Sequence, residues 1–123
     1  MPPALSAHRD AWKDAAAKWS GVFCAGDFSI RGGSYRDVPV ELITRFDEAG
    51  APVQTAARMM LKGPAPAPLP ADAQRIFNSL ATECPGLSVA PDAVEATLPA
   101  PVDPLLAESL WRAQLRLVQS LTS

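Results

Sequence analysis

A run of alternating side chains over residues 34–46 limits most strongly what this chain can fold into. Apolar side chains or threonine occupy every second position of the run, and mainly charged residues or proline lie between them. The side chains on the first face are Val38, Val40, Leu42, Thr44 and Phe46. Because successive side chains of a strand point to opposite faces, the pattern predicts a strand with one face on a core. Such two-sided strands are typical of antiparallel sheets.

Further strands are predicted on both sides of this run. Residues 53–61 alternate in the same way after a turn in "DEAGAP", and residues 22–31 predict a strand before it. Gly32 and Gly33 separate two alternating stretches, and tight hairpin turns need positive φ at their central positions. We therefore expect a Gly32-Gly33 hairpin turn within a three-stranded antiparallel meander. Residues 87–98 predict a second, smaller hairpin around "APDA".

Helical spacing of apolar side chains occurs in three segments, which are residues 4–19, 71–83 and 104–121. In the last segment, Asp103 suits the N-cap position and Pro104 the first helical position. The prolines lie mainly between these elements. The stretch "KGPAPAPLP" predicts an extended connector, because proline at alternate positions favours polyproline II.

The resulting element order is α-β-β-β-α-β-β-α. It predicts a single α+β domain over residues 1–123, with an antiparallel sheet and helices packed on one face. The side chains that we expect to be buried are Val40, Leu42, Phe77, Leu80, Leu106, Leu110 and Leu117.

The sequence argues against two classes of partner, nucleic acids and membranes. The formal net charge is −2, and lysine and arginine are scattered, so a nucleic-acid-binding surface is not predicted. No apolar run reaches the roughly 18 residues that a membrane span needs. Charged residues between Arg9 and Asp14 interrupt the N-terminal segment, which therefore does not look like a signal peptide. We expect a cytoplasmic protein without a membrane partner.

The residues that most often carry chemistry are few. His8 is the single histidine, so a histidine-dependent catalytic site would have to use it. Cys24 and Cys84 are far apart in sequence and neither belongs to a CxxC motif, so a zinc site is not predicted. The two thiols could form one disulfide, but reduced, buried thiols are the favoured interpretation, and we expect no disulfide requirement.

Phosphate-binding and acid–base sites are not predicted either. Gly32-Gly33 lacks the lysine of a P-loop and the third glycine of a dinucleotide turn. The acids of the first half show no paired arrangement on one secure face, so solvated charge is expected for Asp27, Asp37, Glu41, Asp47 and Glu48. A polar surface of the sheet could be lined by Arg31, Tyr35 and Arg36, for which structural pairing is favoured over substrate binding. No catalytic, metal-binding or cofactor-binding residue and no cofactor are predicted, which favours a non-enzymatic protein.

The element order also resembles a known family. A helix divides "RFDEAGAPVQTAARMML" from "LSVAPDAVEATLPA", and a long helix closes the chain. This order is similar to that of type III secretion chaperone-like domains and of small bacterial sensory-transduction-regulator proteins. The resemblance covers most of the chain, but no functional residue can be transferred through it. It implies an α+β domain that is non-enzymatic, often dimeric, and binds proteins in a chaperone-like way.

The apolar surface of the helices predicts an interaction surface. One small sheet is not expected to cover every apolar side chain of the first and last helices, and large exposed apolar patches usually mark contact surfaces. The residues assigned to this surface are Trp12, Trp19, Trp111, Leu115 and Val118. We expect a homodimer, since isologous pairing is the commonest way to bury such a patch. Three alternatives remain: a different protein partner, an oligomerisation or structural domain, and a small-ligand binder or enzyme with a pocket between sheet and helices.

Overall fold

The structure, a computed structural model, describes residues 3–84, 86–100 and 103–122. Six antiparallel strands form one open sheet in the order β1-β2-β3-β4-β6-β5. The strands are β1 (Val22–Cys24), β2 (Ser29–Tyr35), β3 (Val38–Phe46), β4 (Pro52–Met60), β5 (Ser88–Val89) and β6 (Ala93–Pro99). The helices are α1 (Pro3–Ser6), α2 (Arg9–Lys18), α3 (Ala71–Leu80) and α4 (Leu106–Thr122). The predicted α+β fold is confirmed, with four strands instead of three before α3.

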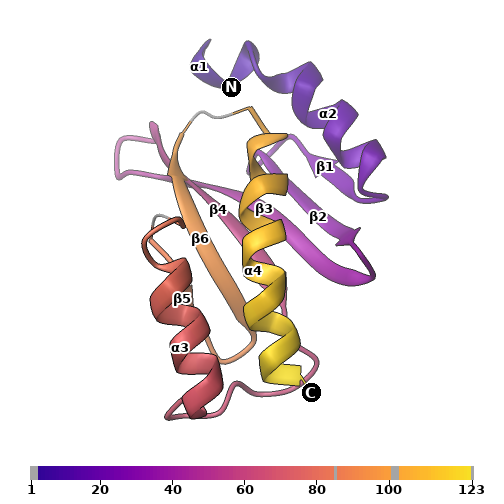
Figure 1. The fold of residues 1–123 in the computed structure, drawn as a ribbon. Coiled ribbons are helices and arrows are strands. Elements are labelled where there is room, and N and C mark those ends of the chain that lie inside the picture. The colour runs from indigo at the N-terminus through magenta and orange to yellow at the C-terminus, as the bar shows by residue number, and fades with distance from the viewer. Residues whose placement is uncertain (1–2, 85, 101–102, 123) are drawn as a thin grey trace.

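The helices cover one face of the sheet. Figure 1 shows α3 and α4 side by side in front of the strands, with α2 near the start of α4. Helix α4 packs on β4 and β6, α3 packs on α4, and α2 packs on β1 and β2. The pairing of β4 with β6 joins segments that α3 and its connectors separate in sequence.

The hairpin between β2 and β3 turns at Arg36 and Asp37, so the predicted turn at Gly32-Gly33 was wrong. Both Arg36 and Asp37 have positive φ, 50° and 67°, as a two-residue primed turn requires. Gly32 and Gly33 lie inside β2, where the register with β3 shifts between Ile30 and Gly33. Gly32 has a φ of 70° and takes the left-handed position of a bulge.

The strand predicted over residues 22–31 is two strands, β1 and β2, which pair with each other. The chain reverses over residues 25–28, and Phe28 has a φ of 50° in this turn. Its side chain is buried, with ring centroids 4.7 Å from Trp12 and 5.2 Å from Phe23. Burial of this aromatic ring in the core accounts for a turn where the sequence pattern indicated a continuous strand.

The N-terminal helix predicted over residues 4–19 is also divided. A turn separates α1 from α2, and in it the His8 N–H donates a hydrogen bond to the Leu5 carbonyl over 2.9 Å. Leu5 and Trp12 are both buried in the same cluster, so the two short helices still contribute to one core.

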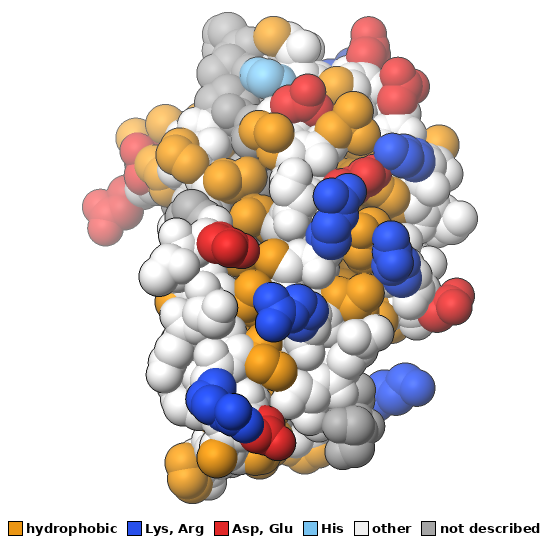
Figure 2. Space-filling model, viewed as in Figure 1, with side chains coloured by type: hydrophobic (Ala, Val, Ile, Leu, Met, Phe, Trp, Pro, Cys, Tyr) orange, Lys and Arg blue, Asp and Glu red, His pale blue; other side chains and the backbone are white. Residues whose placement is uncertain are grey.

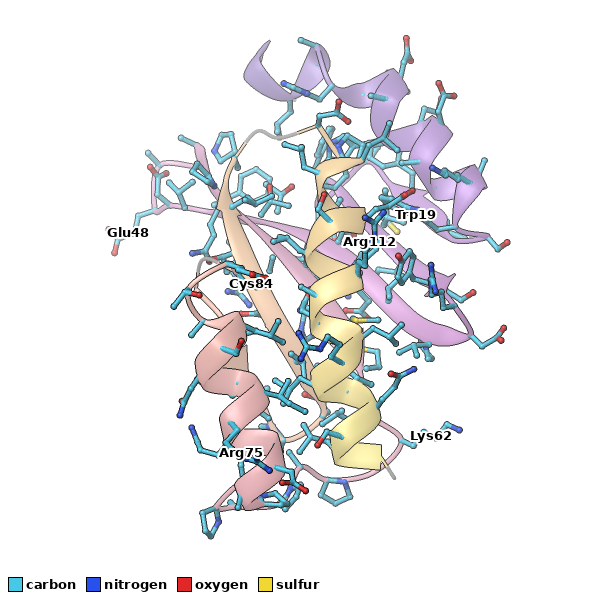
Figure 3. All side chains as sticks on the ribbon, viewed as in Figure 1. Trp19, Glu48, Lys62, Arg75, Cys84 and Arg112 are labelled. Carbon is cyan, nitrogen blue, oxygen red and sulfur yellow. The ribbon has the colours of Figure 1, made fainter. Side chains whose placement is uncertain are left out.

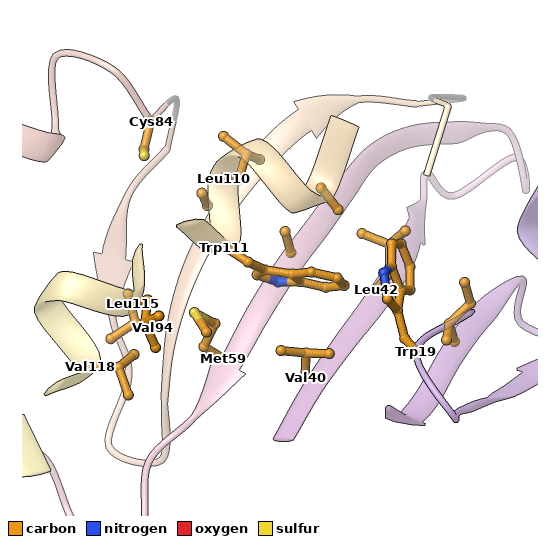
Figure 4. Packing of buried hydrophobic residues seen from close by; sticks show 14 of the residues in the cluster. Trp19, Val40, Leu42, Met59, Cys84, Val94, Leu110, Trp111, Leu115 and Val118 are labelled. Carbon is orange, nitrogen blue, oxygen red and sulfur yellow. The ribbon is translucent and has the colours of Figure 1, made fainter. Parts of the chain in front are cut away.

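Trp111 fills the space between α4 and the sheet. Figure 4 shows its ring above Val40 and beside Trp19. The Trp19 and Trp111 ring centroids are 4.6 Å apart, with an angle of 76° between the ring planes. Such edge-to-face contacts add to the free energy gained by burying the two rings. Trp19 follows α2 directly, so this pair links the N-terminal segment to α4.

Gln114 places a polar group in the centre of this apolar interface. Its side chain is fully buried, and its Nε2 donates hydrogen bonds of 3.1 Å to the carbonyl oxygens of Ala57 and Val94. Ala57 belongs to β4 and Val94 to β6. One amide group therefore ties α4 to both strands of the central pair.

Most side chains that the sequence assigned to the core are buried. Those confirmed as buried are Val40, Leu42, Leu80, Leu110 and Leu117, while Phe77 is partly buried. The prediction that Leu106 is buried was wrong, because 51% of this residue is exposed. The Asp103 Oδ1 accepts a hydrogen bond of 3.0 Å from the Leu105 N–H, as an N-cap does. The turn that follows directs Ala107 into the core, and Leu106 lies on the outward side.

A pair of matched substitutions in α4 tests this assignment. Leu110→Ala should lower the free energy of unfolding by about 2–5 kcal/mol, because a buried leucine leaves a cavity. Leu106→Ala removes the same atoms from an exposed site and should change the free energy by less than about 1 kcal/mol. Denaturant unfolding measures both, and equal effects would contradict the orientation of the helix.

Candidate functional site

Charged side chains line the face of the sheet that lies opposite the helices. Glu41 on β3, Arg58 on β4 and Glu95 on β6 lie side by side in register. Arg58 pairs with Glu41 over 3.5 Å, with Glu95 over 3.4 Å, and with Asp92 over 3.3 Å. The guanidinium group thus joins three carboxylates across three elements.

A second bridge crosses β4 diagonally. Arg45 donates two hydrogen bonds to the Glu95 carboxylate, over 2.6 Å and 3.1 Å. On β4, Arg45 faces Gln54 and Glu95 faces Arg58, so the bridge passes over Ala56, which lies between those two residues. Ala56 is 0% exposed, although none of the described helices covers this face. The long charged side chains themselves cover the sheet here, as alkyl stems of arginine often do.

Asp27 and Ser29 extend this network to the edge of the sheet. The Ser29 hydroxyl donates to Asp27 over 2.6 Å, and Arg31 contacts both Asp27, over 3.3 Å, and Glu41, over 3.7 Å. The Ser29 hydrogen bond, with help from Arg31, lowers the pKa of Asp27 below its usual value. General acid catalysis needs a carboxyl group that holds its proton, so this arrangement favours a structural role for Asp27.

The remaining polar residues that the sequence singled out do not join this network. Asp47 accepts hydrogen bonds of 2.9 Å from the backbone N–H groups of Ala49 and Ala51, and so stabilises the β3–β4 turn. Tyr35 lies on the helix side of the sheet, with its ring centroid 6.0 Å from that of Trp111. The Arg36 guanidinium lies over the Tyr35 ring at 5.8 Å. Tyr35 and Arg31 are therefore on opposite faces, and they do not form one polar surface.

The histidine and the cysteines lie in separate places. His8 lies between α1 and α2, Cys24 is in the edge strand β1, and Cys84 is buried just after α3. Both cysteines are free. Burial, with a smaller effect of Glu83, raises the pKa of Cys84 above its usual value, which makes the thiol less reactive. Within the described residues, no group of three or more potential ligands could hold a metal ion.

The five residues that the sequence assigned to an interaction surface are buried within the chain. Their side chains, from Trp12, Trp19, Trp111, Leu115 and Val118, all belong to the single core cluster. The expectation that one small sheet cannot cover them was wrong. The two tryptophans of the N-terminal segment and the apolar side of α4 cover one another, which the sequence pattern could not indicate.

Glu108 holds the N-terminal segment against α4. Its Oε1 accepts a hydrogen bond of 2.9 Å from the Trp19 indole N–H and pairs with the Lys18 ammonium group over 2.7 Å. These two donors, the Lys18 contact first, lower the pKa of Glu108 below its usual value. The carboxylate therefore satisfies a largely buried indole N–H that would otherwise lack an acceptor.

A cleft lies between α2 and the start of α4, close to Glu108. It has a volume of about 360 Å³ and is lined by Ala11, Asp14, Ala15, Lys18, Asp103 and Leu105. Leu105 is 50% exposed, and its neighbour Leu106 is similarly exposed. In Figure 2, hydrophobic side chains near the start of α4 lie beside acidic ones. The sequence pattern predicted that Leu106 is buried. Only the position of the N-cap could have indicated that Leu105 and Leu106 are exposed.

A second groove lies towards the C-terminal end of α4. It lies between α3 and α4, has a volume of about 530 Å³, and is lined by Asp72, Arg75, Ile76, Ser79, Arg116 and Ser120. Figure 3 shows Arg112 on the outward side of α4 and Arg75 on α3. Arg75 pairs with Asp72 in its own helix. The groove is therefore polar, whereas the α2–α4 cleft combines Leu105 and two alanines with charged residues.

Comparisons of the chain with protein-family models, with curated proteins and with solved structures found no match. The resemblance to secretion chaperones and sensory-transduction regulators stays a prediction. None of the helices, as far as they are described, is long and apolar enough to cross a bilayer.

Substitution of Ala56 tests how the charged face is covered. Ala56→Leu should lower the free energy of unfolding by about 1–3 kcal/mol, because the added atoms meet the Arg45–Glu95 bridge. In an Arg45→Ala background the same substitution should cost less, since the side chain above it is gone. A double-mutant cycle measured by denaturant unfolding gives the coupling between the two sites. Strictly additive effects would show that the bridge does not cover Ala56.

Glu108 should make stability depend on pH. Its pKa is lowered in the folded chain, so its contribution is fully present above the unfolded value of about 4.3 and is lost as pH falls through the folded value. The difference in unfolding free energy between the wild type and Glu108→Gln should therefore shrink below about pH 4.3. Glu48→Gln, at the exposed β3–β4 turn, is the control. A difference that stays constant down to pH 2 would contradict the role of the carboxylate charge.

Proposed function

We propose that this chain is a non-enzymatic protein-binding domain that contacts its partner through Leu105, Leu106 and the α2–α4 cleft. One observation carries the proposal: two adjacent leucines are half exposed beside a cleft that can hold an apolar side chain. Burial of one leucine side chain contributes about 1.5–3 kcal/mol, which is enough to make it an anchor of a protein contact. A chaperone-like role fits this proposal, because a chaperone also recognises exposed apolar segments.

The alternative of a small-ligand binder or enzyme with a pocket between sheet and helices has less support. Trp111, Met59 and Gln114 fill that space. On the opposite face of the sheet, the carboxylates of Glu41 and Glu95 already form ion pairs with arginines. A cytoplasmic location belongs to the same proposal, and the free thiols of Cys24 and Cys84 fit a reducing compartment.

A homodimer remains a prediction, and its location changes. The five residues first assigned to the interface are buried, so we place self-association at Leu105 and Leu106. A two-fold axis beside these leucines would bury both copies of the patch. Light scattering at increasing concentration tests this, since one chain has a mass of 13.0 kDa. A protein that stays monomeric rules out the dimer and leaves a different partner.

Peptide selection against the folded domain tests the binding surface. Peptides from a displayed library should bind the wild type and should bind Leu105→Asp at least about tenfold more weakly, because the anchor contact is lost. Val22→Asp is the matched control. Val22 is an exposed apolar residue of β1, on a different element, and receives the same new charge.

Folding of each variant is checked by its thermal transition before binding is measured. Selected peptides that bind the wild type and Leu105→Asp equally well would contradict the proposed surface. Equal loss in Leu105→Asp and Val22→Asp would show a nonspecific effect of charge, which also contradicts it.

A further inference from the structure

The outward side of α4 continues from the leucine cleft to the polar groove. Leu105 lines the cleft, Arg112 is exposed on the middle of the helix, and Arg116 lines the groove beside α3. Arg112 and Arg116 are four residues apart within α4, so they share one side of a helix with 3.6 residues per turn, and Leu105 lies in the turn just before that helix. Arg112 is exposed, and Figure 3 shows it beside α4, on the side towards Trp19.

Arg112 and Arg116 differ from the arginines of the sheet. Arg31, Arg45 and Arg58 each pair with at least one carboxylate. Within the part of the chain that the structure describes, Arg112 and Arg116 have no ion-pair partner. The acids near them are already occupied: Glu108 bonds to Lys18 and Trp19, and Asp72 in the groove bonds to Arg75. The Glu108 carboxylate attracts Arg112 without forming an ion pair with it, so both guanidinium groups can still pair with an outside anion.

The charge of the outward side of α4 differs between its two ends. Asp14 and Asp103 line the cleft, and the one cation in its lining, Lys18, is paired with Glu108. The cleft end is thus acidic and the opposite end of the outward side is basic. An acidic group of a partner is favoured beside Arg112 and Arg116 and disfavoured beside the cleft.

We infer that the partner is a protein segment with an apolar anchor followed by acidic residues, which lies along the outward side of α4. The anchor enters the α2–α4 cleft against Leu105, and the carboxylates pair with Arg112 and Arg116. This inference rests on the proposed protein-binding function and adds the chemical class and the direction of the segment.

The geometry of α4 sets the spacing of the segment. With a rise of about 1.5 Å per residue, Arg112 lies about 10 Å and Arg116 about 16 Å along the helix from Leu105. An extended segment advances about 3.3 Å per residue and directs every second side chain to the same face, so acids four and six residues from the anchor face the helix with it. They lie about 13 Å and 20 Å along the segment, which long arginine side chains can reach.

Fluorescence anisotropy with synthetic peptides tests the inference. The first peptide carries leucine with glutamate four and six residues after it, in a serine and glycine background. The second replaces both glutamates by glutamine, and the third places them before the leucine. The first peptide should bind about 3- to 10-fold more tightly than the other two at low ionic strength, as two exposed ion pairs allow. Salt should remove the difference.

Protein variants separate this inference from the proposed function. The Arg112→Gln, Arg116→Gln double variant should lose the preference for glutamate, while the Lys13→Gln, Lys62→Gln double variant, with the same change of net charge, should keep it. If the glutamine peptide binds as tightly as the glutamate peptide and Leu105→Asp weakens both, the acidic partner is wrong and the binding surface stands. If Leu105→Asp weakens neither peptide, the proposed surface is wrong, and the inference falls with it.

Discussion

The pairing of β4 with β6 is the interaction on which the rest of this fold depends. It joins two strands that are separated in sequence by α3, so it carries a larger loop-closure cost than the hairpins do. The pair is held from both sides. On the helix side, the Gln114 amide bonds to a carbonyl oxygen of each strand, and on the other side Glu95 pairs with Arg58 and Arg45. Helix α4 lies over this pair, and α3 and the N-terminal segment pack against α4 in turn.

The two faces of the sheet are covered by different physical means. The helix face buries aromatic and aliphatic side chains around Trp111. On the other face, arginine and glutamate side chains lie across the strands and cover small residues such as Ala56. Ion pairs of this kind contribute little individually, but a network in which Arg31 and Arg58 each meet more than one carboxylate fixes the positions of its members. The charged side chains of this face therefore pair with one another. The arginines on the outward side of α4 form no ion pair within the described part of the chain.

Patterns with a fixed period could be predicted from the sequence, and contacts between distant elements could not. The alternation in β3 and the apolar stripe of α4 gave the α+β fold and buried residues such as Leu42 and Leu117 correctly. The hairpin turn was misplaced because Gly32-Gly33 and Arg36-Asp37 can both adopt positive φ, and only the strand register decides between them. The interaction surface was misassigned for a related reason. Whether Trp19 is exposed depends on Trp111 and Glu108, both from the other end of the chain.

The leucines at the start of α4 are not explained by the fold of the chain. The first turn of a helix favours acidic residues, which interact well with the positive end of the helix dipole. Glutamate and glutamine form helices about as well as leucine does, so helix propensity does not require leucine at position 106. Scattered surface leucines are ordinary in soluble proteins, but Leu105 and Leu106 are adjacent, and Leu105 lines a cleft. Neither gains the full free energy of burial within this chain, and contact with another molecule is the interaction that would supply it.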